Sequence, residues 1–181
     1  MFNVLFSFKE VLNDHESMIY IDTTVRFHSN QVDSITDSVK KIGTLFNYKN
    51  VKLNCYSNEK IFDWFSEKPE TFNNINLIKT NVLAFHRNFL TSLILKAWVT
   101  CALDENCISP PGSNPNGGFL SSLLGCKHCG CHRYDENAIT IINSYFYGYP
   151  KHSKMYLPAY SFTLNQTKLF TIEKNFGMSY F

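Results

Sequence analysis

The chain has 181 residues, of which 18% are charged and 15% aromatic, and its formal net charge is +2. This length suits one globular domain that buries about two thirds of the surface of its unfolded chain, and the composition excludes a disordered chain. Lysines and arginines are scattered among acidic residues, which argues against a nucleic-acid partner. We therefore expect a single domain over residues 1–181 with one hydrophobic core.

Hydrophobic spacing predicts strands that alternate with helices along the chain. Helices are expected over residues 2–13, 32–45, 59–65, 89–103 and 135–146, and strands over residues 18–21, 51–56 and 82–85. Pro, Gly, Ser and Asn crowd residues 110–118 and predict a long surface loop, and residues 149–181 form an aromatic, strand-like C-terminal extension. The pattern indicates an α/β fold with a mixed sheet flanked by helices.

The segments that could meet a membrane are short. Residues 89–103 are apolar but contain Lys96, and they fall short of the roughly 20 residues that cross a bilayer. Residues 1–8 lack both a cationic start and a small-residue cleavage site, so no signal peptide is recognisable. The six cysteines and the glycosylation sequon at Asn165 nevertheless indicate the secretory pathway, in the Golgi or outside the cell.

Asp22 is the first candidate functional residue, because it ends the apolar run 18–21 and precedes Thr24 and Arg26. Ligands of open α/β sheets bind beyond the carboxyl ends of strands. A carboxylate there could ligate a divalent metal or bind a sugar hydroxyl, and Arg26 could pair with a phosphate. The alternative is an aspartate that forms a turn with the following backbone amides, and both interpretations stay open.

Residues 131–137 are the second candidate, because an imidazole, a guanidinium, a phenol and two carboxylates crowd the start of a predicted helix. Asp135 or Glu136 could act as a general base or bind a sugar, and Arg133 could stabilise a developing negative charge. The alternative is a capping cluster whose acids complement the helix dipole and whose arginine forms a surface ion pair.

Five cysteines are expected to form disulfides: Cys101 and Cys107, which bracket a short polar loop, and Cys126, Cys129 and Cys131, which lie within six residues. A zinc site made of the last three thiols and His132 is the alternative. Structural zinc sites usually join two ligand pairs across a longer stretch of chain, so the spacing favours disulfides.

Several blocks of the sequence occur together in one order: IYIDTTVRF at residues 19–27, EKP at residues 67–69, WVTCAL at residues 98–103 with Cys107 and Pro110, and CHRYD at residues 131–135. Over residues 15–148 they resemble an uncharacterised, nematode-abundant invertebrate family that is itself similar to GT-A glycosyltransferases. The resemblance implies the C-terminal part of a GT-A fold without its N-terminal nucleotide-binding half. It also implies a secretory-pathway protein that carries a membrane anchor in a full-length form.

The resemblance also implies a division of roles. Asp22, Thr24 and Arg26 would face the donor diphosphate, with Mn²⁺ or Mg²⁺ on Asp22, while His132, Arg133 and Asp135 would act on the acceptor side. The sequence departs from the family pattern in two places: no second carboxylate follows two positions after Asp22, and Glu136 stands where the family has Gln.

The implied function is a hexosyltransferase-like transfer of a sugar from a nucleotide donor to a glycan or protein acceptor. The alternative is a non-catalytic, disulfide-stapled secreted domain that binds carbohydrate or protein.

Overall fold

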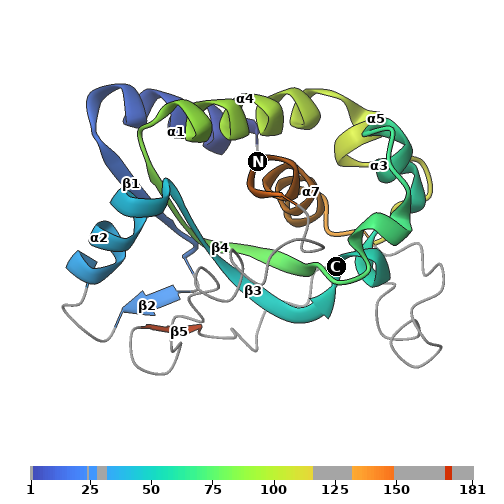
Figure 1. The fold of residues 1–181 in the computed structure, drawn as a ribbon, viewed down its shortest axis with the longest axis horizontal. Helices are drawn as coiled ribbons and strands as arrows, with labels where there is room; N and C mark the ends of the chain where they lie inside the picture. The colour runs from blue at the N-terminus through green and yellow to red at the C-terminus, as the bar shows by residue number, and fades with distance from the viewer. Residues whose placement is uncertain (1, 24, 28–31, 116–131, 149–169, 173–181) are drawn as a thin grey trace, which may run out of the picture.

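A three-stranded antiparallel sheet lies at the centre of the fold (Figure 1). The computed structural model describes residues 2–23, 25–27, 32–115, 132–148 and 170–172. Strands β1 (Ser17–Ile21) and β3 (Thr44–Lys52) pair with opposite edges of β4 (Asn76–His86), so the order is β1-β4-β3. A second, two-stranded sheet joins β2 (Val25–Phe27) to β5 (Phe170–Ile172).

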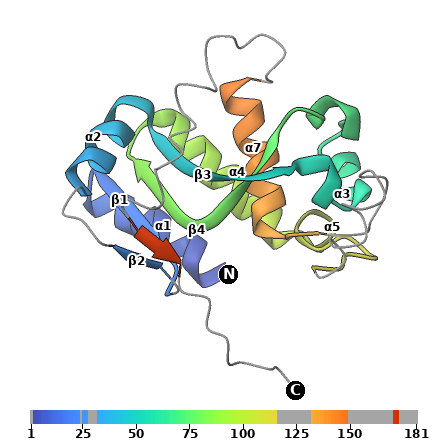
Figure 2. The same cartoon turned by 90° about the horizontal axis from the view of Figure 1, so that it is seen from below.

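Helices cover both faces of the main sheet (Figures 1 and 2). Helices α1 (Phe2–Asp14) and α4 (Phe89–Leu103) lie side by side on one face, and α7 (Asp135–Tyr147) runs between α4 and β4. Helix α2 (Val32–Ile42) packs on the other face. Short helical segments gather at one end of the sheet: η1 (Leu53–Tyr56), α3 (Glu59–Trp64), η2 (Pro69–Phe72) and α5 (Glu105–Ile108).

Alternation along β4 divides the core between the two faces. Val82 and Ala84 pack with the α2 side, whereas Leu83 and Phe85 join the cluster under α1, α4 and α7. Successive side chains of a strand point to opposite faces, so a slip of one residue would exchange the two sets. Burial on both faces therefore fixes the register of β4.

Gly43 ends α2 and sets the start of β3. Its φ of +96° lies in the region that favours glycine, and an added Cβ would lie 2.5 Å from Asn88 Nδ2. The chain therefore turns at once into β3, which runs from Thr44 to Lys52. The predicted helix end at residue 45 is wrong, because α2 ends at Ile42 and β3 begins at Thr44. The predicted strand over residues 51–56 is also wrong, because residues 53–56 form η1, in which Leu53 and Cys55 are buried.

The layered arrangement of a sheet flanked by helices is confirmed, and so are the predicted helices that became α1, α3, α4 and α7. The expected mixed sheet is not found, because every strand pair among the described residues is antiparallel. Residues 110–115 of the predicted loop belong to no helix or strand, and the rest of that loop lies outside the described residues. None of the helices described is both long and apolar enough to span a membrane.

Candidate functional site

Asp22 lies at the end of β1, as the sequence predicts. Its backbone amide donates to the Asn81 carbonyl at 2.8 Å, and its own carbonyl accepts from the Val25 amide at 2.9 Å. The second bond closes a turn, so the turn interpretation of this aspartate also holds for its backbone. Its side chain is half-buried and accepts a hydrogen bond of 3.4 Å from the Thr23 hydroxyl.

Arg26 is exposed and braces the same turn. Its Nη1 donates to the Thr23 carbonyl at 2.6 Å and to the Val25 carbonyl at 3.1 Å. Thr24, the third residue expected on the donor side, lies outside the described residues.

Asp135 begins α7 and is held by β4. The Thr80 hydroxyl donates to Asp135 Oδ2 at 2.8 Å. The carboxyl group is largely buried, and this burial raises its pKa above the usual range, while the hydrogen bond from Thr80 and the charge of Lys49 act in the opposite direction.

Adjacent residues of β4 hold the two segments that carry the candidate carboxylates. The Thr80 hydroxyl donates to the Asp135 carboxylate, and the Asn81 carbonyl accepts from the backbone amide of Asp22. Burial raises the pKa of the Tyr20 phenol, and the charges of Asp22 and then Asp135 raise it further. The end of β1 and the start of α7 therefore lie against the same stretch of β4, and together they make the candidate site.

Glu136 adds a charge pair to this site. The Lys49 ammonium contacts Glu136 Oε2, and the two side chains are only 24% and 13% exposed. Burial raises the pKa of Glu136, while Lys49 lowers it and the neighbouring Asp135 raises it again. The charge of the exposed Arg133 also lowers this pKa.

His132 is fully buried and holds three segments together. Asn58 N–H donates to its Nδ1 at 3.4 Å, and its Nε2 lies 3.0 Å from the Ile108 carbonyl, so Nε2 carries the proton that is donated there. Burial lowers the pKa of the ring to about 4, which keeps it neutral. The expected place of His132 on the acceptor side does not fit these contacts, because a side chain 0% exposed cannot touch an acceptor.

The backbone before α7 is strained. Tyr134, which lies between His132 and Asp135 in the sequence, has a backbone φ of +41°. Residues other than glycine rarely adopt such a value. Asn137, also fully buried, accepts from the Arg133 amide at 2.5 Å and donates to the Tyr56 carbonyl at 2.8 Å. His132 and Asn137 thus fix both sides of Asp135, so they are positioning residues of the site.

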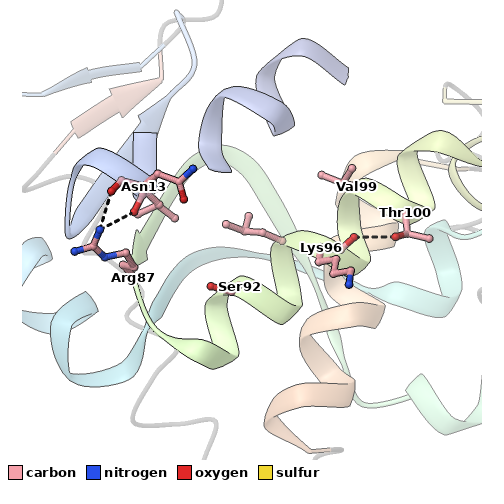
Figure 3. A pocket seen from close by; sticks show the side chains of 8 residues that line it. Asn13, Arg87, Ser92, Lys96, Val99 and Thr100 are labelled. Carbon is pink, nitrogen blue, oxygen red and sulfur yellow. Dashed lines mark hydrogen bonds between the residues drawn. The ribbon is translucent and has the colours of Figure 1, made fainter. Parts of the chain in front are cut away.

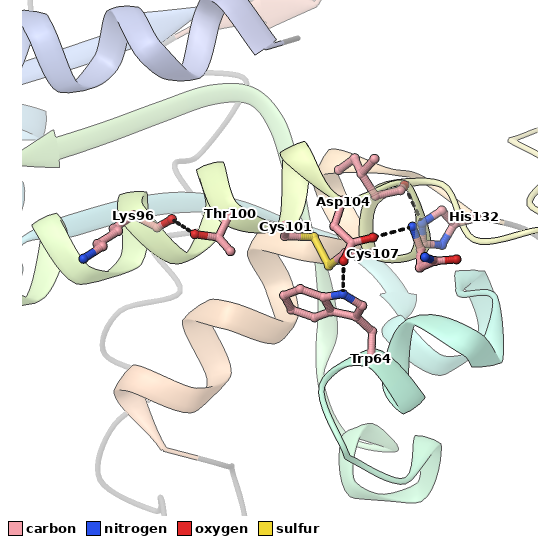
Figure 4. Close-up of a disulfide and its surroundings, with 9 residues drawn as sticks. Trp64, Lys96, Thr100, Cys101, Asp104, Cys107 and His132 are labelled. Carbon is pink, nitrogen blue, oxygen red and sulfur yellow. Dashed lines mark hydrogen bonds between the residues drawn. A yellow bond between two sulfur atoms is a disulfide. The ribbon is translucent and has the colours of Figure 1, made fainter.

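Cys101 and Cys107 are disulfide-bonded as expected, and they pair with each other, which the sequence left open; both positions are fully buried (Figure 4). In the loop that this disulfide closes, Asp104 Oδ2 accepts a hydrogen bond of 2.8 Å from Trp64 Nε1. Cys55, which was not among the cysteines expected to form disulfides, is also disulfide-bonded. Cys126, Cys129, Cys131 and the sequon at Asn165 lie outside the described residues.

The side chains around Asp22 do not assemble a metal site. Among the described residues, no group of three or more His, Cys, Asp or Glu side chains could hold an ion. Asp22 would give Mn²⁺ or Mg²⁺ a single carboxylate ligand, so the other ligands of such an ion would come from substrate phosphates and water. The reaction proposed for this site is assigned to side chains alone.

Sequence reasoning missed Tyr20, Thr80 and Lys49, which complete the site. Each lies inside a strand of the main sheet, and a polar residue in a strand gives no local signal of function. Neither the family models, nor the curated proteins, nor the solved structures compared with this chain match it. The relation to a GT-A-like family therefore rests on the sequence blocks alone.

Proposed function

We propose that this chain is a glycosyltransferase-like domain of the secretory pathway that transfers a sugar from a nucleotide donor to a hydroxyl group of a glycan or protein. One observation carries the proposal. Asp22 and Asp135, from the two blocks that resemble the donor and acceptor motifs of the GT-A-like family, both raise the pKa of Tyr20. The charges of two segments that are distant in the sequence thus act on one phenol.

Asp135 is suited to act as the general base. Burial raises its pKa toward neutrality, which improves a carboxylate as a proton acceptor, and the Thr80 hydroxyl holds one carboxylate oxygen in place. Asp22 follows the last residue of β1 and is half-buried. In this proposal it binds donor hydroxyl groups, and the exposed guanidinium groups of Arg26 and Arg133 face the diphosphate.

The proposed reaction is a single displacement at the anomeric carbon. The acceptor hydroxyl gives its proton to Asp135 while its oxygen forms a bond to the anomeric carbon. The bond from that carbon to the diphosphate oxygen breaks, and the nucleoside diphosphate leaves with the electron pair. The arginine side chains stabilise the negative charge that develops on this leaving group.

Donor binding tests the proposal. Isothermal titration of the whole chain with UDP-sugars and GDP-sugars, with and without Mn²⁺, is expected to give saturable binding of at least one donor. Asp22→Asn should weaken it about tenfold or more, the loss expected for a hydrogen bond to a charged group. The control is Asp37→Asn on α2, an exposed acid far from the site in sequence, which should bind like wild type with the same melting temperature.

The second candidate is a non-catalytic domain that binds carbohydrate. It is favoured by Tyr20, whose phenol is influenced by the charges of Asp22 and Asp135, because an aromatic ring and carboxylates can bind a sugar without a nucleotide. If no nucleotide sugar binds and a free glycan does, with the same loss in Asp22→Asn, the catalytic proposal fails and this one stands.

A further inference from the structure

A pocket of about 480 Å³ lies between α1 and α4, away from the site described above (Figure 3). Its volume falls within the roughly 300–1,000 Å³ typical of small-molecule sites. Leu12 and Asn13 of α1 line one side, and Arg87 lies at the end where β4 passes into α4. None of the candidate site residues contributes to it.

One stripe of α4 forms the other wall. The lining residues recur at helical spacing and are Ser92, Leu95, Lys96, Val99 and Thr100. Together with Leu12, the side chains of Leu95 and Val99 make the interior mainly apolar. A molecule bound along this stripe would therefore bury an apolar body against α1 and α4.

The charged groups of the pocket have one sign. Arg87 and Lys96 are the ionisable residues of its lining, and none of the carboxylates that the structure describes lines it. Arg87 Nη1 donates to the Leu12 and Asn13 carbonyls at 3.5 and 2.8 Å, so the guanidinium is fixed beside the last turn of α1. Lys96 is exposed, and its ammonium has no ion-pair partner within the part of the chain that the structure describes.

We infer that this pocket binds a fatty acid, whose chain lies along Leu95 and Val99 and whose carboxylate is held by Lys96, while Arg87 adds positive charge at the other end of the lining. The inference rests on charge complementarity: an apolar pocket with two cations and no acid favours an apolar anion over a neutral or cationic molecule of the same shape. It is independent of the proposed sugar transfer, because the two sites share no residue.

Titration with dodecanoate, below its micelle concentration, tests the inference on the whole chain. We expect one saturable site and about tenfold weaker binding of dodecanol, which has the same chain without the charge. Lys96→Gln should weaken dodecanoate binding about tenfold and leave dodecanol binding unchanged. Lys68→Gln, which removes an exposed charge outside the lining, should change neither.

A second variant separates pocket filling from charge. Ser92 lies on the lining and is exposed, so Ser92→Trp places a large ring in the pocket without entering the core. It should abolish dodecanoate binding while the melting temperature stays within a few degrees of wild type. The inference is overturned if dodecanoate does not bind, if both lysine variants weaken it equally, or if binding survives in Ser92→Trp.

Discussion

The Thr80 hydroxyl donates a hydrogen bond of 2.8 Å to Asp135 Oδ2, so the middle of β4 holds the first residue of α7. The next residue of the strand, Asn81, accepts a hydrogen bond from the backbone amide of Asp22. Adjacent positions of one strand therefore hold the Asp135 carboxyl group and the backbone of Asp22, which come from distant parts of the chain. The expected consequences of this arrangement can be measured by substitution, pH and reduction.

Removing the Thr80 hydroxyl should destabilise the protein. Thr80→Val keeps the branched shape that suits a strand but removes the side-chain hydrogen bond to the largely buried Asp135 carboxylate, which keeps only its backbone donors. We expect a loss of about 1–2 kcal/mol at pH 7, measured by urea denaturation. Thr71→Val is the control, because Thr71 makes the longer bond of 3.3 Å to Glu67. If both variants lose the same free energy of unfolding, the hydrogen bond from Thr80 to Asp135 does not contribute more to stability than the bond from Thr71 to Glu67.

The Lys49–Glu136 ion pair should show measurable coupling. Lys49→Met leaves a partly buried carboxylate unpaired and is expected to cost about 1–3 kcal/mol at pH 7. Glu136→Gln and the double variant complete a cycle whose coupling energy should be about 1–2 kcal/mol. A coupling energy near zero would mean that the contact contributes nothing.

The same pair predicts a pH dependence. Burial raises the pKa of Glu136 above its value in the unfolded chain, so the folded protein binds the proton more tightly and loses stability as the pH rises and this group ionises. Lys49 opposes that loss. Stability should therefore fall more steeply from pH 4.5 to 7 in Lys49→Met than in wild type, as followed by denaturation at several pH values. Parallel curves would contradict this.

Protonation of His132 should lower the stability of the folded protein in acid. Its pKa falls from 6.5 in the unfolded chain to about 4 in the folded protein, so between these values only the unfolded chain binds the proton. The stabilisation is complete above pH 6.5 and is lost as the pH falls to about 4, by an amount of about 3 kcal/mol. His132→Gln cannot titrate, so its stability should fall less over this interval. Identical slopes would show that His132 does not control acid stability.

The Cys101–Cys107 disulfide should contribute modestly to stability. Its sequence separation of 6 closes a short loop, for which the loss of chain entropy in the unfolded state amounts to about 2 kcal/mol. Cys101→Ala with Cys107→Ala should lower the free energy of unfolding by about that amount in urea. The variant keeps the disulfide of Cys55, so reduction should destabilise it further. An unchanged free energy of unfolding would contradict the prediction.

The parts of the fold set by local pattern could be predicted. Residues 89–103 are too long and apolar for a strand, and they form α4 with the bounds predicted. The abrupt change from apolar residues to Asp22 likewise placed that residue correctly at the end of β1. Strand direction was not predictable, because β1, β3 and β4 give the same local pattern in parallel and antiparallel pairing.

The site itself depends on contacts between distant residues. The burial of His132 comes from Asn58 and Ile108, and no local spacing connects these residues to it. Thr80 and Lys49 lie in segments that the sequence did not assign to a strand, so their place beside Asp135 and Glu136 was not foreseeable. Residue density near Asp135 identified the correct neighbourhood but not the groups that complete it.

The rate at which the chain releases nucleoside diphosphate from a nucleotide sugar, with acceptor present, tests most directly whether Asp22 and Asp135 form one catalytic site. We predict that Asp22→Asn and Asp135→Asn each lower this rate about a hundredfold or more with the melting temperature unchanged. The double variant should lose little beyond the worse single one, because residues that act as a unit are not additive. A wild-type rate in either single variant would contradict the account.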